Sequence, residues 1–170
     1  MSIEDFLVRQ LGLAKDLVEN RISTIFLNGC CVDHIETAVI EDGSVLALSA
    51  ALPGLAGASL RRGGYYACLR ESITRSEEIF NGRMHEGVIV VKLFNLLIGE
   101  LGPVFLKKGI IMFRSDIAAF FRGCNQDFWN QVESAHLEDR SVVSSILAGE
   151  DIYRGAESIL ISVCEPGDRE

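Results

Sequence analysis

The sequence has few positive charges for its length. Its 16 lysines and arginines are outnumbered by 24 aspartates and glutamates, which gives a formal net charge of −8. A protein with this charge repels phosphate backbones and anionic lipid surfaces at long range, so we expect neither nucleic acid nor membrane as a partner. A local group of arginines is still able to bind one small anion, because a pocket responds to nearby charges more than to the net charge.

The sequence also lacks the motifs of common cofactor and metal sites. Neither G-x-G-x-x-G nor G-x-x-x-x-G-K-[ST] is present, so no standard phosphate loop is predicted. There is no C-x-x-C and no H-x-x-x-H, and the pair Cys31 and His34 is two ligands short of a complete zinc site. We therefore predict no metal site, and the sequence leaves any cofactor unknown.

A disulfide scaffold and a signal peptide are missing as well. The five cysteines are an odd number without scaffold spacing, and the first five residues carry two acids and no base. Both features predict a cytoplasmic protein with reduced thiols. The uncharged run over residues 43–60 approaches the length of a short membrane span, but its serines, its glycines and Pro53 favour a turn followed by a small-residue helix.

The chain does have enough apolar sequence for a core. It contains 170 residues, of which 48% are hydrophobic, and no linker or repeat divides it. This length is typical of one domain with a full core, so we predict a single globular domain over residues 1–170. The apolar excess also predicts surface buried between subunits, with a homodimer as the first expectation.

Apolar runs and turn residues predict an α+β fold with a mixed or mainly antiparallel sheet flanked by helices. Asp42-Gly43 separates two apolar runs and suits a tight turn, so we predict a β-hairpin over about residues 37–49. Ser2 and Ser115 are placed to cap two of the helices. The other predicted elements are strands at 23–27, 88–94, 110–113 and 158–164, helices at 3–18, 65–73, 95–108, 115–132 and 139–149, and an exposed loop at 81–87.

The first candidate site is the glycine break that ends the small-residue helix after Pro53. Guanidinium groups pair with a carboxylate or phosphate, and glycine amides with a tyrosine hydroxyl are able to complete such a pocket. Neighbouring helical residues point about 100° apart, so only one of two adjacent arginines is expected to face a ligand. The alternative is a helix packed close to the sheet, with solvated arginines and a glycine C-cap. The predicted ligand-binding residues are Arg61, Arg62, Gly63, Gly64, Tyr65, Tyr66 and Arg70.

The second candidate site is the polar segment over residues 30–36, which contains two thiols, an imidazole and two carboxylates. Groups of this kind are able to supply the acid and base of an enzyme, and a Cys–His couple is able to supply a nucleophile and its base. We predict Asp33, His34 and Glu36 as the catalytic residues. The alternative for His34 is a loop residue that is hydrogen-bonded to the backbone.

Two classes of function remain open. The first is a cytoplasmic enzyme or binding protein for a small anionic molecule, either a carboxylate or a phosphate. It requires the loop at 29–36 and the glycine break at 63–64 to meet in space. The second class is a noncatalytic dimerising module for regulation or scaffolding, in which the apolar excess becomes an interface.

Overall fold

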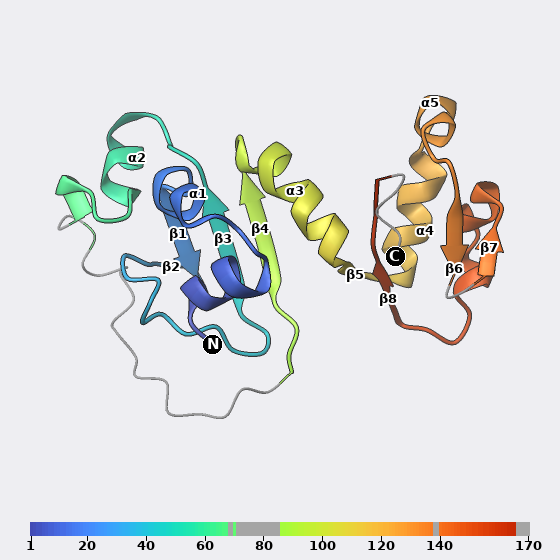
Figure 1. The fold of residues 1–170 in the computed structure, drawn as a ribbon, viewed down its shortest axis with the longest axis horizontal. Coiled ribbons are helices and arrows are strands. Elements are labelled where there is room, and N and C mark those ends of the chain that lie inside the picture. Colours follow the sequence, from blue (N-terminus) through green and yellow to red (C-terminus); the bar gives the residue numbers. More distant parts are fainter. Residues whose placement is uncertain (68–69, 71–85, 138–139, 166–170) are drawn as a thin grey trace. The chain divides into compact units, whose positions relative to one another are not determined.

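The computed structural model describes residues 1–67, 70, 86–137 and 140–165, and it has helices with mixed and antiparallel sheets (Figure 1). The α+β prediction is therefore confirmed. The chain divides into two compact units, Met1–Val104 and Phe105–Glu170, which are described separately below. This division does not test whether the two units fold together as one domain, so the single-domain expectation stays a prediction.

A mixed four-stranded sheet forms the centre of the first unit. Its strands are β1 (Thr24–Leu27), β2 (Cys30–Cys31), β3 (Val45–Ser49) and β4 (Val90–Phe94), in the spatial order β2-β1-β3-β4. Strand β1 is antiparallel to β2 and β3, whereas β3 is parallel to β4 (Figure 1). The predicted strands at 23–27 and 88–94 correspond to β1 and β4.

The hairpin predicted over residues 37–49 is wrong. The turn itself exists, because the amide of Ser44 donates to the carbonyl of Glu41 over 3.1 Å and Gly43 has a φ of +76°. Strand β3 follows this turn but pairs with β1 and β4, and residues 37–41 contribute only an isolated bridge between Val39 and Ser2. The apolar run before the turn is buried against the N-terminal residues. Turn residues do not determine this pairing partner, because it lies far away in the sequence.

The hairpin in this sheet lies between β1 and β2 instead. Leu27 pairs with Cys30, which leaves a two-residue loop of Asn28 and Gly29. Both loop residues have positive φ, at 52° and 83°, as a type I′ turn requires. This turn places β2, and the residues that follow it, at the edge of the sheet.

The N-terminal segment covers this sheet with two short helices in place of the single helix predicted over 3–18. They are the π-helical turn η1 (Asp5–Gln10) and α1 (Lys15–Asn20), and Gly12 between them has a φ of +76°. The Ser2 hydroxyl accepts a hydrogen bond from the Asp5 amide, as predicted. The core of this unit contains Ile3, Leu7, Ile22, Ile25, Leu27, Leu46, Leu48, Leu97 and Leu101, all fully buried. Each such side chain contributes roughly 1.5–3 kcal/mol of burial free energy.

Two further helices follow strands of this sheet, one after β3 and one after β4. Helix α2 (Gly54–Leu60) packs tightly at Gly57, where a Cβ atom would lie 2.0 Å from the carbonyl oxygen of Leu52. Helix α3 (Leu97–Lys108) follows β4, continues through Pro103 without a restart, and stops at Gly109, whose φ is +102°. The predicted helix at 95–108 is therefore confirmed to within two residues.

The described residues of the second unit form two antiparallel two-stranded sheets, one of β5 (Ile110–Phe113) and β8 (Ser158–Ile161) and the other of β6 (Ala135–Leu137) and β7 (Arg140–Val142). Ile117, Ala118 and Tyr153 are buried at its centre, with Met112 and Ile159 among the side chains packed around them. The predicted strands at 110–113 and 158–164 correspond to β5 and β8. In chain order the elements are β5 (Ile110–Phe113), α4 (Arg114–Gly123), α5 (Gln126–Asn130), β6 (Ala135–Leu137), β7 (Arg140–Val142), η3 (Ser144–Ala148), η4 (Glu150–Tyr153) and β8 (Ser158–Ile161).

Three helix predictions need correction. The predicted helix over 115–132 is split, because the Asn125 side chain accepts a hydrogen bond from the Phe128 amide and starts α5. Ser115 does not cap α4, whose N-cap position is Phe113. The residues predicted as a helix over 139–149 form β7 and the 3₁₀ helix η3, apart from 139, which lies outside the described residues.

Two predictions fall largely outside the described residues. Of the predicted helix at 65–73, residues 65–67 form a 3₁₀ turn and residue 70 is described, while 68–69 and 71–73 are not. Of the predicted exposed loop at 81–87, only residues 86 and 87 are described, and both are exposed.

Candidate functional site

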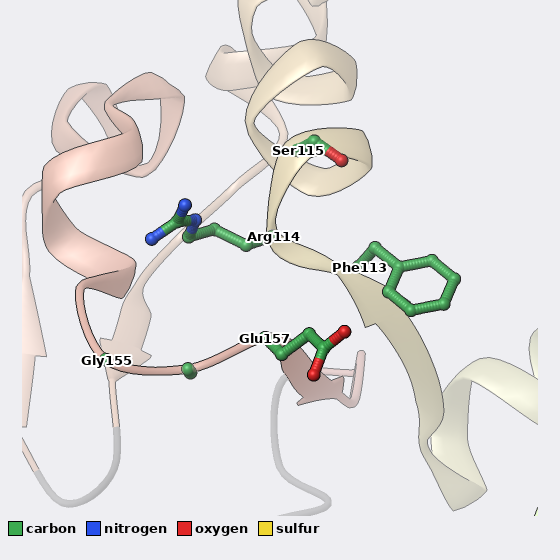
Figure 2. A pocket seen from close by; sticks show the side chains of 6 residues that line it. Phe113, Arg114, Ser115, Gly155 and Glu157 are labelled. Carbon is green, nitrogen blue, oxygen red and sulfur yellow. The ribbon is translucent and has the colours of Figure 1, made fainter.

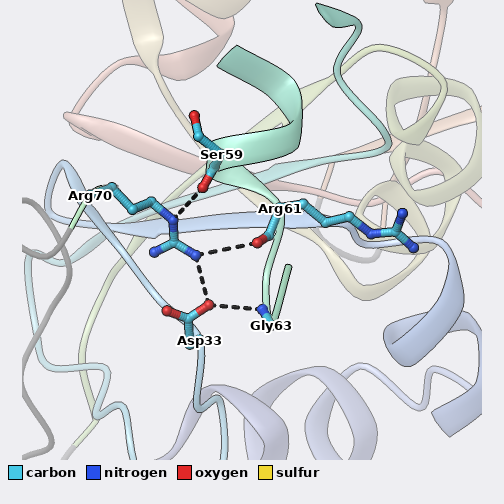
Figure 3. Close-up of polar contacts among 5 residues, drawn as sticks. All are labelled: Asp33, Ser59, Arg61, Gly63 and Arg70. Carbon is cyan, nitrogen blue, oxygen red and sulfur yellow. Dashed lines mark hydrogen bonds and ion pairs between the residues drawn. The ribbon is translucent and has the colours of Figure 1, made fainter. Parts of the chain in front are cut away.

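The two candidate segments meet at Asp33, which lies two residues beyond β2. Oδ1 of Asp33 accepts a hydrogen bond from Nη2 of Arg70 over 2.7 Å and another from the Gly63 amide over 2.9 Å (Figure 3). The loop at 29–36 and the glycine break at 63–64 therefore lie together, as a shared site requires. Asp33 and Gly63 are 30 positions apart along the chain, so the fold and not their sequence proximity brings the two segments together.

Arg70 is the centre of this cluster and is almost fully buried. Its Nε donates to the Ser59 carbonyl over 2.6 Å, and its Nη2 donates to the Arg61 carbonyl over 3.3 Å as well as to Asp33. The side chains of Arg70 and Asp33 are 3% and 19% exposed. Arg70 thus ties the end of α2 to the residues after β2, and Asp33 neutralises its charge.

The ion pair sets the protonation state of Asp33. Burial on its own raises the pKa of this carboxyl, but the hydrogen bonds from Arg70 and the Gly63 amide outweigh it, and the pKa lies below its usual range. Asp33 is therefore a carboxylate at neutral pH. A carboxylate held by two donors is a weak base, which disfavours the predicted catalytic role for this residue.

Arg62 points its guanidinium into the protein. Its Nη2 donates to the Val18 carbonyl over 3.1 Å, and its amide donates to the Ser23 carbonyl over 2.8 Å. Its Nη1 is buried and has no hydrogen-bond partner within the described part of the chain. Arg62 therefore fixes the glycine break to the N-terminal segment, and its charge is turned away from solvent.

Arg61 has the opposite orientation. Its backbone is extended rather than helical, with φ −64° and ψ 129°, so adjacent side chains leave on opposite sides. Figure 3 shows its side chain extending away from Asp33 and Arg70. Arg61 is exposed, and among the described residues no hydrogen bond or ion pair involves its guanidinium. Arg61 therefore faces solvent and Arg62 does not, for a reason other than the helical geometry that the sequence suggests, and contact of Arg61 with a ligand stays a prediction.

The glycines and tyrosines of the break have separate roles. Gly63 has a φ of +60°, and the Gly64 amide donates to the Arg61 carbonyl over 3.1 Å. Both glycine amides are therefore used within the protein. Tyr65 and Tyr66 are exposed, and their rings meet edge to face with centroids 5.2 Å apart. These exposed aromatic rings follow Arg61 closely in the sequence.

The other predicted catalytic residues do not join Asp33. Nδ1 of His34 lies 3.3 Å from Oε1 of Glu36, and both side chains are more than half exposed. Cys31 is buried, and burial raises the pKa of its thiol, with Asp33 adding to the rise and Arg70 opposing it. A buried thiol with a raised pKa is a poor nucleophile at neutral pH. The three predicted catalytic side chains thus do not converge.

Sequence reasoning missed the pairing of Asp33 with Arg70. Arg70 is predicted as part of an anion clamp, yet the anion that it contacts is a side chain of the same protein. The available signal is its position directly after the apolar run Ala67-Cys68-Leu69, because an arginine in apolar sequence needs an internal partner when it is buried.

Comparison of the chain with protein-family models, curated proteins and solved structures finds no match. Within the described part of the chain, no three His, Cys, Asp or Glu side chains gather in a way that would hold a metal ion. No helix among the described residues is long and apolar enough to cross a membrane.

Proposed function

We propose that this chain is a binding protein for a small anion, a carboxylate or a phosphate, that is contacted by Arg61. The observation that supports this proposal is the exposed guanidinium of Arg61, which has no partner among the described residues and is followed in the sequence by two exposed tyrosines, Tyr65 and Tyr66. An unpaired guanidinium attracts a carboxylate or phosphate that the net charge of −8 otherwise repels.

The proposal assigns different roles to the three arginines. Arg70 and Arg62 hold the backbone of residues 59–63 through carbonyl oxygens of Ser59, Arg61 and Val18. Because this backbone is fixed, the Arg61 side chain starts from a defined position, which reduces the entropy lost when a ligand binds. The hypothesis of an enzyme receives less support, because Asp33 accepts a hydrogen bond from Arg70 and the side chains of His34 and Glu36 are exposed to solvent.

A ligand screen tests this function. The probes are inorganic phosphate, acetate, succinate and citrate, each followed by thermal unfolding and then by calorimetric titration. A probe at 100 times its Kd should raise the free energy of unfolding by about 2.7 kcal/mol. Arg61→Gln should remove that increase, and Arg62→Gln is not used because Arg62 is structural.

Arg9→Gln is the matched control, because Arg9 is also an exposed arginine of the first unit and forms an exposed ion pair with Asp5. This variant should bind the probe as the wild type does. Equal loss in both variants would indicate nonspecific attraction, and no stabilisation by any probe would reject the function.

A second candidate function, self-association, is favoured by the surface around β4. This strand is at the edge of the sheet, and Val90, Phe94, Leu96 and Ile98 are each about half or more exposed. A two-fold axis places the same patch on both copies, so an apolar patch is able to bury itself against its own copy. Lys92 lies on the same face as Val90 and Phe94, which disfavours direct edge-to-edge pairing of two β4 strands.

Light scattering distinguishes this candidate. Self-association predicts a mass of twice 18.7 kDa at micromolar concentration, which Phe94→Ser should reduce to that of one chain. Leu55→Ser, at another exposed leucine of the first unit, should leave the mass unchanged. A single-chain mass for the wild type at all concentrations would reject it.

A further inference from the structure

The second unit contains a hollow that includes none of the candidate residues of the first unit. It has a volume of about 480 Å³ and lies where β5 passes into α4, opposite the segment that leads into β8 (Figure 2). The Arg114 amide donates to the Glu157 carbonyl over 3.1 Å, which joins the two sides. The lining residues are Phe113, Arg114, Ser115, Gly155, Ala156 and Glu157.

Two opposite charges line this hollow without pairing. Arg114 is half-buried and Glu157 is exposed, and among the described residues neither side chain makes a hydrogen bond or an ion pair. Two other arginines of the same unit pair with acids, since Nη2 of Arg122 donates to Oε1 of Glu150 over 2.8 Å and Nη2 of Arg154 lies 2.9 Å from Oδ1 of Asp151. Arg114 and Glu157 differ from these pairs because they line one hollow and leave their charged groups unpaired among the described residues.

The two charged groups point in different directions. Figure 2 shows the Arg114 side chain extending toward the helical ribbon that precedes Gly155, while the Glu157 carboxylate turns to the opposite side, toward Phe113. Phe113 is 60% exposed, so its ring is open to a ligand. A cation beside Glu157 would gain from the carboxylate and from the face of this ring.

We infer that this hollow binds a zwitterion whose ammonium and carboxylate groups are several bonds apart. The carboxylate pairs with Arg114, and the ammonium lies between Glu157 and the Phe113 ring. An amino acid with both charges on one carbon does not span two groups that point apart. The ligand class is an ω-amino acid or a short peptide with free ends, which share this chemistry.

Four probes of similar size separate these requirements. 6-Aminohexanoate has both charges at its ends, norleucine is its isomer with both charges on one carbon, and hexanoate and hexylamine each carry one charge. Amide chemical shifts of residues 113–115 and 155–157 are followed by NMR while each probe is added to the full chain. A Kd on the order of millimolar is expected for 6-aminohexanoate, since the hollow is open and the probe small. The other three probes should bind at least fivefold more weakly, and triglycine should bind as 6-aminohexanoate does if the natural ligand is a peptide.

Two variants assign the charges. Arg114→Gln and Glu157→Gln should each weaken 6-aminohexanoate binding at least tenfold, while hexanoate should respond only to the first variant and hexylamine only to the second. Arg122→Gln is the control, because Arg122 belongs to α4 but does not line the hollow. Should Arg114→Gln impair folding, the exposed Glu157→Gln variant carries the test alone. Equal binding of all four probes, affinity unchanged by Glu157→Gln, or no shifts at the lining residues would overturn the inference.

Discussion

Arg70 in the first unit and Arg114 in the second put the same side chain to opposite uses. Arg70 is buried, paired with Asp33 and hydrogen-bonded to two carbonyl oxygens. Arg114 is half-buried beside a hollow, and no described residue pairs with it. An arginine is therefore available to a ligand only where the fold leaves its charge uncompensated. Residue type and sequence neighbours do not determine whether the fold supplies a partner.

Removing the partner of the buried arginine should have the largest effect. Asp33→Ala removes a carboxylate that pairs with the nearly buried Arg70 guanidinium, so we expect a loss of about 3–5 kcal/mol in the free energy of unfolding. Asp33→Asn keeps one oxygen acceptor and should cost less. Urea denaturation measures both variants. Asp5→Asn, in an exposed pair with Arg9, should stay within about 0.5 kcal/mol of the wild type, and a similar small change at Asp33 would contradict the structural role of this pair.

The same pair predicts a dependence on pH. The folded pKa of Asp33 lies below its ordinary value of 3.8, so its contribution to stability is complete above that value and is lost as pH falls through the lower folded pKa. The stability difference between wild type and Asp33→Asn should therefore narrow as pH falls from 6 toward 2. Urea titrations at fixed pH measure this difference, and a gap that widens at low pH would show the opposite sign of the shift.

Matched glycines in the two units measure how strongly the backbone at each site is coupled to its surroundings. Gly63 and Gly155 have φ of +60° and +89°, and an added Cβ would meet no atom within 4 Å at either position. Alanine at each should cost about 1 kcal/mol of backbone strain. Gly63→Ala should cost more than Gly155→Ala, because the Gly63 amide also donates to Asp33. Equal costs would mean that the Asp33 cluster tolerates small shifts of this amide.

The smallest effect on stability is expected at the unpaired arginine. Arg114→Gln removes a charge that has no partner among the described residues, so the free energy of unfolding should change by about 0.5 kcal/mol or less. Urea denaturation of this variant beside Asp33→Ala tests the comparison directly. A loss as large as that at Asp33 would show that Arg114 is structural and would remove the contrast between the two arginines.

Local sequence signals predicted the elements that depend on local chemistry. Strands β4, β5 and β8 follow from short apolar runs, and α3 from its terminal lysines and Gly109. The split after α4 was missed because Asn125 interrupts an apolar periodicity that otherwise continues. The partners of β3 were missed because a turn determines where a chain reverses and not which strand it then meets.

The candidate site was predictable only in part. Residues 33 and 63 lie together, as the anion-binding hypothesis requires. The different orientations of Arg61 and Arg62 come from an extended backbone, whereas the sequence pattern suggests a helix there. The burial of Arg70 depends on the packing of segments 37 positions apart. The hollow beside Arg114 depends on the antiparallel pairing of β8 with β5. Neither of the two segments that line it, 113–115 and 155–157, contains a motif that would predict it.

The parallel pairing of β3 with β4 bears on the order in which the first unit folds. Val45 pairs with Val90, whereas the β1–β2 hairpin closes over two residues and is able to form within microseconds. Closing the longer connection between β3 and β4 costs more chain entropy than closing the two-residue hairpin. During synthesis β3 and β4 are also able to pair only after β4 has left the ribosome. Until β4 is synthesised, β3 is itself an unprotected edge with two leucines that are fully buried in the finished protein. A nascent chain that pauses before Val90 therefore exposes β3 as an unpaired apolar edge strand. Expression of fragments that end before β4 should yield aggregates rather than a smaller folded protein.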